Sequence, residues 1–209
     1  MKWLARMRMP YEVAARNKLR DGYDWHQALW QAFPGRDDQA RDFLTRVDKK
    51  EREFIVYLLS MQRSVCPPWC PQEYWEVSEI RSGFLNHEYY RFDLLANPTR
   101  KVVKIGADGE QTKNGRREAL LKPEEQAEWL TRKARQGGFI VLDVPPLESG
   151  KPQRLTFEHK QRDGRHFGVN FKGLLNVTDQ SIFHETFRRG IGSAKGFGFG
   201  MLMLQPISF

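Results

Sequence analysis

The chain has 209 residues and a formal net charge of +8, and 40% of its residues are hydrophobic. This apolar fraction excludes a disordered chain, and the length fits one large domain or two compact ones of roughly 100 residues each. The basic balance favours a polyanionic partner, nucleic acid before an anionic membrane. No apolar run approaches the roughly 20 residues that span a membrane, and the first ten residues lack the apolar core of a secretory signal. We therefore expect a cytoplasmic protein with no membrane association.

The first half of the sequence predicts four strands and one helix. Met1–Met9 alternates apolar with mostly basic residues, as a half-buried strand does. Asp24–Phe33 has apolar residues at helical spacing, with Asp24 as the expected N-cap and Pro34-Gly35 as the end. Further strands are expected at Asp42–Val47, Glu53–Ser60 and Tyr74–Ile80. Prolines 67, 68 and 71 mark a loop before the last strand, where no second helix is evident.

The second half has the same order of elements. The strands expected are Tyr89–Ala96, Phe139–Val144 and Phe199–Ile207, and the helices are Pro123–Gln136 and a segment from Thr178 or Asp179 to Arg189, closed by Gly190. Between them lies a hairpin, with alternating apolar residues over 155–159 and 167–177. Asp163-Gly164 is the expected turn, because this pair tolerates the positive φ angles of tight hairpins.

Strand–helix–strand–strand–helix–strand, twice over, is the ferredoxin-like pattern. The sequence thus predicts an α+β fold of two tandem ferredoxin-like (RRM-like) domains, residues 1–87 and 88–209, with the boundary near Asn86–Glu88.

The two cysteines, Cys66 and Cys70, belong to a Cys-Pro-Pro-Trp-Cys segment. A structural zinc site needs four ligands, and no second Cys/His pair at zinc spacing follows. We expect a reduced thiol pair, no metal site and no cofactor.

Residues 190–200 are rich in glycine. Glycines let backbone N–H groups approach a phosphate, so Lys195, Gly196 and Gly198 are candidate RNA contacts. A Walker A loop is excluded, because Lys195 is followed by glycine and then a strand. The segment matches the first five positions of the RNP1 signature of RRM domains but lies too near the C-terminus for it. A turn that needs glycine for close packing is the structural alternative.

Tyr23 and His26 are three residues apart near the predicted helix start, so they share a face if this segment is helical. Metal-free RNA cleavage by the ribose 2′-OH needs proton transfer, for which histidine suits neutral pH, and positive charge at the phosphate. A position near the positive helix end would help to keep His26 neutral. A partly buried, structural histidine is the alternative. Lys160, at the end of a hairpin arm, is a candidate for the phosphate charge.

Two basic regions are candidates for the RNA surface. Arg162 and Arg165 bracket the expected hairpin turn, and a basic tip of this kind can lie along a duplex and contact its phosphates. The second region follows Asn97-Pro98-Thr99 and contains Arg100, Lys101, Lys113, Arg116 and Arg117. His159 and His166 flank the hairpin and are weaker candidates, whereas His87 and His184 are expected to be structural.

Several segments together resemble one known family. FKGLLNVTD (171–179), IFHETFRRGIG (182–192) and KGFGFGMLMLQPI (195–207) resemble the C-terminal signature of the RAMP endoribonucleases of CRISPR systems. LLANPTRKV (94–102), GRREALLKPEEQAEWLTRKARQGGF (115–139) and GYDWHQALWQAF (22–33) resemble segments of their CasE-type members. The segment around 61–88 is least similar.

The resemblance implies a tandem ferredoxin-like fold and metal-independent cleavage of precursor CRISPR RNA at the 3′ base of a repeat hairpin. It further implies that the product stays bound within type I-E Cascade, with the other Cascade subunits as partners and a monomer when free. It assigns Tyr23 and His26 to the catalytic site and leaves open whether His26 is the base or the acid. The alternatives are a non-catalytic RNA-binding subunit of the same fold, an RRM-type single-strand binder and a general structural RNA-binding protein.

Overall fold

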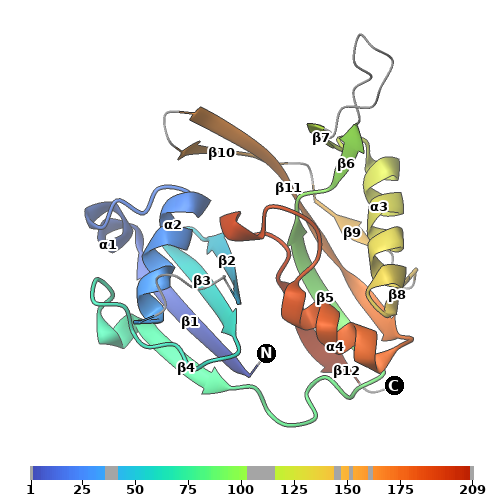
Figure 1. Ribbon diagram of the computed structural model, residues 1–209, viewed down its shortest axis with the longest axis horizontal. Helices are drawn as coiled ribbons and strands as arrows, with labels where there is room; N and C mark the ends of the chain where they lie inside the picture. Colours follow the sequence, from blue (N-terminus) through green and yellow to red (C-terminus); the bar gives the residue numbers. More distant parts are fainter. Residues whose placement is uncertain are drawn as a thin grey trace.

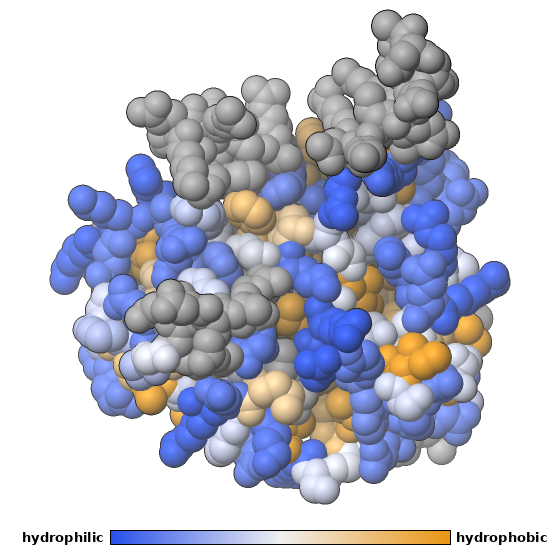
Figure 2. Space-filling model, in the orientation of Figure 1, coloured by the Kyte–Doolittle hydropathy of each residue, from blue (hydrophilic) through white to orange (hydrophobic). Residues whose placement is uncertain are grey.

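The computed structural model describes residues 2–35, 42–102, 116–143, 147–150, 153–159 and 162–207; for residue 116 and residues 153–159 and 162–165 it describes the backbone only. Figure 1 shows two α/β units side by side, with both chain ends at the same end of the molecule. None of the helices in these ranges is long and apolar enough to cross a membrane. Hydrophilic residues cover most of the face seen in Figure 2, and apolar residues form separate patches.

The N-terminal unit is an antiparallel sheet in the order β2-β3-β1-β4. Its strands are β1 (Trp3–Pro10), β2 (Phe43–Lys49), β3 (Glu53–Ser60) and β4 (Trp75–Glu79). The helices α1 (Tyr11–Arg16) and α2 (Gly22–Leu29) and the 3-10 turn η1 (Trp30–Ala32) connect β1 to β2. Between β3 and β4 the chain forms only the 3-10 turn η2 (Gln72–Tyr74), because the prolines of this segment remove backbone donors that a helix needs.

The C-terminal unit repeats this arrangement. Its strands β5 (Tyr89–Ala96), β8 (Phe139–Leu142), β11 (Arg162–Val177) and β12 (Leu202–Ile207) pair antiparallel, with β11 between β8 and β5 and with β12 beside β5. Helices α3 (Pro123–Gln136) and α4 (Gln180–Arg189) cover one face (Figure 1). Both units therefore have ferredoxin-like strand order, and the predicted tandem ferredoxin-like fold is confirmed. The short strand β9 (Glu148–Ser149) also pairs with β11.

Two hairpins extend from the C-terminal unit on the same side of the molecule (Figure 1). One pairs β6 (Thr99–Val102) with β7 (Arg116–Ala119), and the local sequence pattern did not predict it. The other pairs β10 (Gln153–His159) with the first part of β11. The predicted turn at Asp163-Gly164 is wrong, because both residues are inside β11, where Asp163 pairs with Glu158 and Gly164 with Phe157.

The two units meet through an apolar cluster and a buried ion pair. Leu44 and Leu59 of the N-terminal sheet pack against Phe187 and Met201 of the C-terminal unit. The Arg46 side chain, 6% exposed, donates to Asp48 at 2.8 Å and across the interface to Asp93 at 2.7 Å. Each unit also has its own core. We propose that the units divide near residue 87, within the segment between β4 and β5.

Candidate active site

The helix α2 carries Tyr23 and His26. It begins one turn earlier than predicted: Asp21, not Asp24, is its N-cap, and the Asp21 carboxylate accepts hydrogen bonds from the backbone N–H of Tyr23 at 2.8 Å and of Asp24 at 3.0 Å. The Asp24 carboxylate instead accepts from the backbone N–H of Arg20. Residues 23–26 are thus fully helical, and the side chains of Tyr23 and His26 lie on one face of α2.

His26 lies half-buried at the edge of the N-terminal core. Its ring centroid is 5.8 Å from that of Phe43 in β2 and 6.1 Å from that of Trp30. The expectation that His26 lies near the positive end of the helix is wrong, because α2 has only eight residues and His26 is in its last turn. The dipole effect at a helix start fades within one turn.

The glycine-rich segment packs directly on the start of α2. Its 3-10 turn η3 (Lys195–Phe197) contacts both α2 and β2. The rings of Tyr23 and Phe197 have centroids 6.1 Å apart. A Cβ on Gly22 would lie 2.7 Å from the carbonyl oxygen of Phe197, closer than real Cβ contacts come. The fold therefore brings the predicted catalytic helix and the predicted glycine-rich loop together, although they belong to different units.

The predicted phosphate contacts in this loop have structural partners. Lys195 Nζ donates at 2.7 Å to the carbonyl oxygen of Arg189, in the last turn of α4. Gly198 has a φ of +87°, and a Cβ there would point toward the backbone of β2. Glycine at 198 is thus explained by backbone conformation and not by close approach of a phosphate. Gly196 lies within η3. The structural alternative for the loop accounts for these contacts, and RNA contact by the three residues stays a prediction.

His166, in β11 where the β10–β11 hairpin joins the sheet, also contacts the glycine-rich loop. Its ring centroid is 4.8 Å from that of Phe197, and Asn97 Nδ2 lies 3.1 Å from His166 Nδ1. Because an amide nitrogen only donates, Nδ1 accepts this bond, which requires the neutral imidazole. Burial lowers the pKa of His166 below its ordinary value of 6.5. Tyr23, Phe197, His166 and Asn97 thus form a continuous series of contacts from α2 to the residue that follows β5.

Sequence reasoning did not identify Phe197 or Gly22 as site residues. Phe197 lies within the RNP1-like segment, and Asn97 begins the Asn97-Pro98-Thr99 segment. Their contacts join segments that are far apart in the sequence, so no local pattern predicts them. The one local signal is the glycine at the first position of the helix, because glycine lowers helix stability and is expected there only where a side chain would not fit.

The cations predicted to bind RNA lie mostly on the two hairpins. In β6–β7, Lys101 stands opposite Arg117 across the ladder, and both are exposed. Arg100, on the other face, pairs with Glu118 at 3.7 Å and Glu125 at 3.4 Å. The backbones of three further predicted cations lie in these hairpins, with side chains not described: Arg116 in β7, Arg162 and Arg165 in β11. Lys160 lies outside the described residues, as does Lys113.

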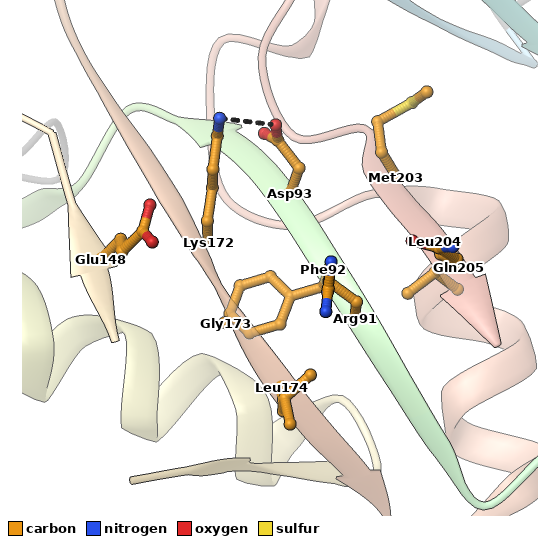
Figure 3. A pocket seen from close by; sticks show the side chains of 10 residues that line it. All are labelled: Arg91, Phe92, Asp93, Glu148, Lys172, Gly173, Leu174, Met203, Leu204 and Gln205. Carbon is orange, nitrogen blue, oxygen red and sulfur yellow. Dashed lines mark ion pairs between the residues drawn. The ribbon is translucent and has the colours of Figure 1, made fainter. Parts of the chain in front are cut away.

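Two of the grooves among the described residues are lined in part by basic side chains. One, of about 580 Å³, lies on the C-terminal sheet, where Lys172 points toward Asp93 at 3.7 Å and Glu148 approaches from β9 (Figure 3). It contains none of the predicted catalytic residues. A second groove of about 490 Å³ runs between α3, α4 and the glycine-rich segment, and Lys133, Arg189 and Lys195 line it. Among the residues that the structure describes, no three His, Cys, Asp or Glu side chains group as metal ligands do.

These features define a tandem ferredoxin-like protein with a Tyr–His helix against a glycine-rich loop. Residues 2–206 match the family model described as CRISPR associated protein, and the chain belongs to this family. It is 30% identical over 197 residues to the CRISPR system Cascade subunit CasE of Escherichia coli K12, covering 93% of this chain and 97% of that one. It is 27% identical to the CRISPR-associated endoribonuclease Cse3 of Thermus thermophilus, covering 98% and 100%.

Solved structures of CRISPR proteins share the fold of this chain. The chain superposes on CRISPR endoribonuclease Cse3 bound to a 19-nucleotide RNA with a TM-score of 0.79 and 25% identity, covering 99% of this chain and all of that one. It superposes on Cas6e from Escherichia coli K-12 with a TM-score of 0.71 and 26% identity, covering 99% and 100%. The resemblance to the CasE-type proteins that the sequence indicated is confirmed.

Proposed function

We propose that this protein is an endoribonuclease that binds a CRISPR repeat hairpin and cuts the precursor RNA at the 3′ base of the stem. The observation that carries the proposal is the shared face of Tyr23 and His26, held against the glycine-rich loop at the junction of the two units. The relatives support it: one is called an endoribonuclease, and its solved structures include one with RNA representing a pre-cleavage complex.

The reaction proposed is attack of the ribose 2′-OH on the adjacent phosphorus. The 2′-oxygen–phosphorus bond forms, the bond to the 5′-oxygen of the next nucleotide breaks, and the product keeps a 2′,3′-cyclic phosphate. His26 transfers a proton, either from the 2′-OH or to the leaving 5′-oxygen. The Tyr23 hydroxyl donates a hydrogen bond to the phosphate or orients the sugar, and Lys160 supplies positive charge to the phosphate. No cofactor takes part.

The RNA duplex would lie against the two hairpins that extend on one side of the molecule (Figure 1). Lys101 and Arg117 present adjacent positive charges on β6–β7, and we propose Arg100, Arg116, Arg162 and Arg165 as further phosphate contacts on the same hairpins. Contacts of this kind read the shape of a duplex more than its sequence. Lys195, Gly196 and Gly198 would hold the backbone near the base of the stem.

We further propose that the protein is a monomer in the cytoplasm when free and retains its product as a subunit of type I-E Cascade. One relative is called a Cascade subunit, and the match to it extends over nearly all of both chains. The other Cascade subunits would then be its protein partners.

Cleavage of a cognate repeat hairpin in excess EDTA tests the proposal. The rate should equal that in magnesium, and the 5′ fragment should end in a 2′,3′-cyclic phosphate or its 3′-phosphate hydrolysis product. A deoxyribose at the nucleotide 5′ of the scissile phosphate should abolish cutting while binding persists, since only the nucleophile is removed. A 3′-hydroxyl product would contradict the mechanism, and tight binding without any cutting would favour the non-catalytic subunit.

A further inference from the structure

The Cys66–Cys70 segment forms a compact turn at the surface of the N-terminal unit. The backbone N–H of Cys70 donates to the carbonyl oxygen of Pro67 at 2.9 Å, and the Cys66 thiol donates back to the carbonyl oxygen of Cys70 at 3.2 Å. Both cysteines are free thiols; Cys66 is partly exposed, whereas Cys70 is 6% exposed. Burial first, and then the neighbouring Cys66 thiol, raise the pKa of the Cys70 thiol to about 12.

This turn is tied to the helix that carries Tyr23 and His26. Trp69, between the two cysteines, donates from Nε1 to the carbonyl oxygen of Ala28 in α2 at 3.2 Å. Its ring also meets the ring of Trp25 edge-on, with centroids 6.2 Å apart. Trp25 is 2% exposed and lies on α2 between Tyr23 and His26 in sequence. A second bond joins the backbone N–H of Val65 to the carbonyl oxygen of Ala32 at 3.0 Å.

The prolines limit which backbone dihedral angles of the turn can change. Pro67 and Pro68 have φ fixed by their rings, and a residue before a proline is restricted as well. Of the three residues between the cysteines, Trp69 alone has a freely rotating φ. A disulfide requires the sulfur atoms at about 2.05 Å, whereas the two thiols donate to separate carbonyl oxygens, Cys66 to that of Cys70 and Cys70 to that of Pro71. The turn therefore adjusts chiefly at Trp69, the residue that holds α2.

We propose that Cys66 and Cys70 form a reversible dithiol–disulfide site, coupled through Trp69 to the position of α2. The oxidant is a small-molecule disulfide such as oxidised glutathione. The accessible Cys66 thiolate attacks one of its sulfurs and releases one thiol. Cys70 then gives up its proton and attacks the Cys66 sulfur, releasing the second thiol. In total, two protein thiols are oxidised to one disulfide and one small disulfide is reduced to two thiols.

The site responds to oxidation by slowing RNA cleavage. Displacing α2 moves Tyr23 and His26 relative to the glycine-rich loop, and displacements near 1 Å lower the rate of catalysis strongly. This coupling to cleavage rests on the proposed function, whereas disulfide formation and movement of α2 do not. A cytoplasmic location agrees with a pair that is reduced by default and oxidised transiently.

The test uses the full chain equilibrated with oxidised glutathione and then with dithiothreitol. Intact mass should show loss of two hydrogens without a glutathione adduct, and hydrogen–deuterium exchange should change in α2. Single-turnover cleavage should slow about tenfold and recover on reduction. Cys66→Ala and Cys70→Ala should form no internal disulfide and keep their rate after the same treatment, once any mixed adduct is removed. Trp69→Phe, which keeps a ring but loses the bond to Ala28, should form the disulfide with a much smaller rate change.

A stable glutathione adduct on Cys66, or two unmodified thiols after equilibration, would overturn the site. A disulfide with unchanged exchange in α2 and unchanged cleavage would overturn the coupling. If the reduced wild type cuts no RNA, the proposed function fails, and the mass and exchange measurements still decide the redox site by themselves.

Discussion

The carbonyl oxygen of Phe197 lies 2.7 Å from where a Cβ on Gly22 would be, which places the glycine-rich loop directly against the first turn of α2. Gly22→Ala should therefore force the loop and α2 apart, since the neighbouring atom is backbone and cannot rotate away. In an open helix position the same change would stabilise by roughly 0.5–1 kcal/mol. Here we expect a net loss of about 1–2 kcal/mol and slower cleavage, measured by urea unfolding and single-turnover assays.

Gln27→Ala, on the exposed face of the same helix, is the matched control and should change neither quantity appreciably. If Gly22→Ala is more stable than the wild type and cuts equally fast, the contact between α2 and the loop does not constrain either segment.

Protonation of His166 should weaken the fold at mildly acidic pH. Burial lowers the pKa of His166 below 6.5 in the folded state, so between the folded and unfolded pKa values the unfolded chain binds more protons. The stabilising contribution is complete above about pH 6.5 and is lost as pH falls toward the folded pKa. Urea midpoints measured from about pH 7.5 to about pH 5.5 should fall less steeply for His166→Gln than for wild type. His184→Gln, on the exposed face of α4, should keep the wild-type slope, whereas equal slopes in all three proteins would refute the assignment.

Breaking the ion pair between the units should destabilise the whole chain. Arg46→Met leaves the Asp48 and Asp93 carboxylates without their buried partner. Loss of one partner of a fully buried pair costs roughly 3–5 kcal/mol; because Asp93 is partly exposed and also meets Lys172, we expect about 2–3 kcal/mol by chemical denaturation. Arg8→Met removes an exposed pair with Glu53 and should cost much less, because solvent screens an exposed pair. Equal losses in the two variants would contradict the role given to Arg46.

The exposed cations of β6–β7 should contribute to RNA affinity by neutralising phosphates. Lys101→Gln with Arg117→Gln should weaken hairpin binding and flatten its salt dependence by roughly 0.7–0.9 in slope for each phosphate that the variant no longer neutralises. Arg100→Gln is the control within the same hairpin, since Arg100 is paired with Glu118 and Glu125 and should affect the slope less. The measurement is a salt titration of affinity. An unchanged slope in the double variant would exclude this face of the hairpin from the RNA-binding surface.

Most elements followed from local patterns, because alternating apolar residues and helix-terminating residues act over a few positions. The strands β2, β3 and β5, the part of β11 from Phe167 onward and the helix α3 were predicted this way, and Asp179 was one of the two caps expected for α4. The β6–β7 hairpin was not predicted, because charged residues on both strands hide their alternation.

The wrong predictions, an N-cap and a hairpin turn, came from residue types that are compatible with more than one local structure. Asp21 and Asp24 are both good N-caps, and only the hydrogen bonds distinguish them. Asp163-Gly164 is a strong turn pair, but the pairing of β10 with β11 places it within a strand. Tyr23, His26 and the glycine-rich loop are the parts of the candidate site that the sequence predicts. The contact that joins these parts lies between the two units, so no pattern of neighbouring residues in the sequence predicts it.

The most direct test of the proposed mechanism is single-turnover cleavage of the cognate repeat hairpin by His26→Ala, with affinity measured in parallel. Because His26 is proposed to transfer a proton in the rate-determining step, the rate should fall by roughly 10²-fold or more, while affinity stays close to that of wild type. Tyr23→Phe, which removes only a hydroxyl, should show a smaller loss. A His26→Ala protein that is folded by circular dichroism and cuts at nearly the wild-type rate would contradict the mechanism and make His26 a structural residue of the N-terminal core.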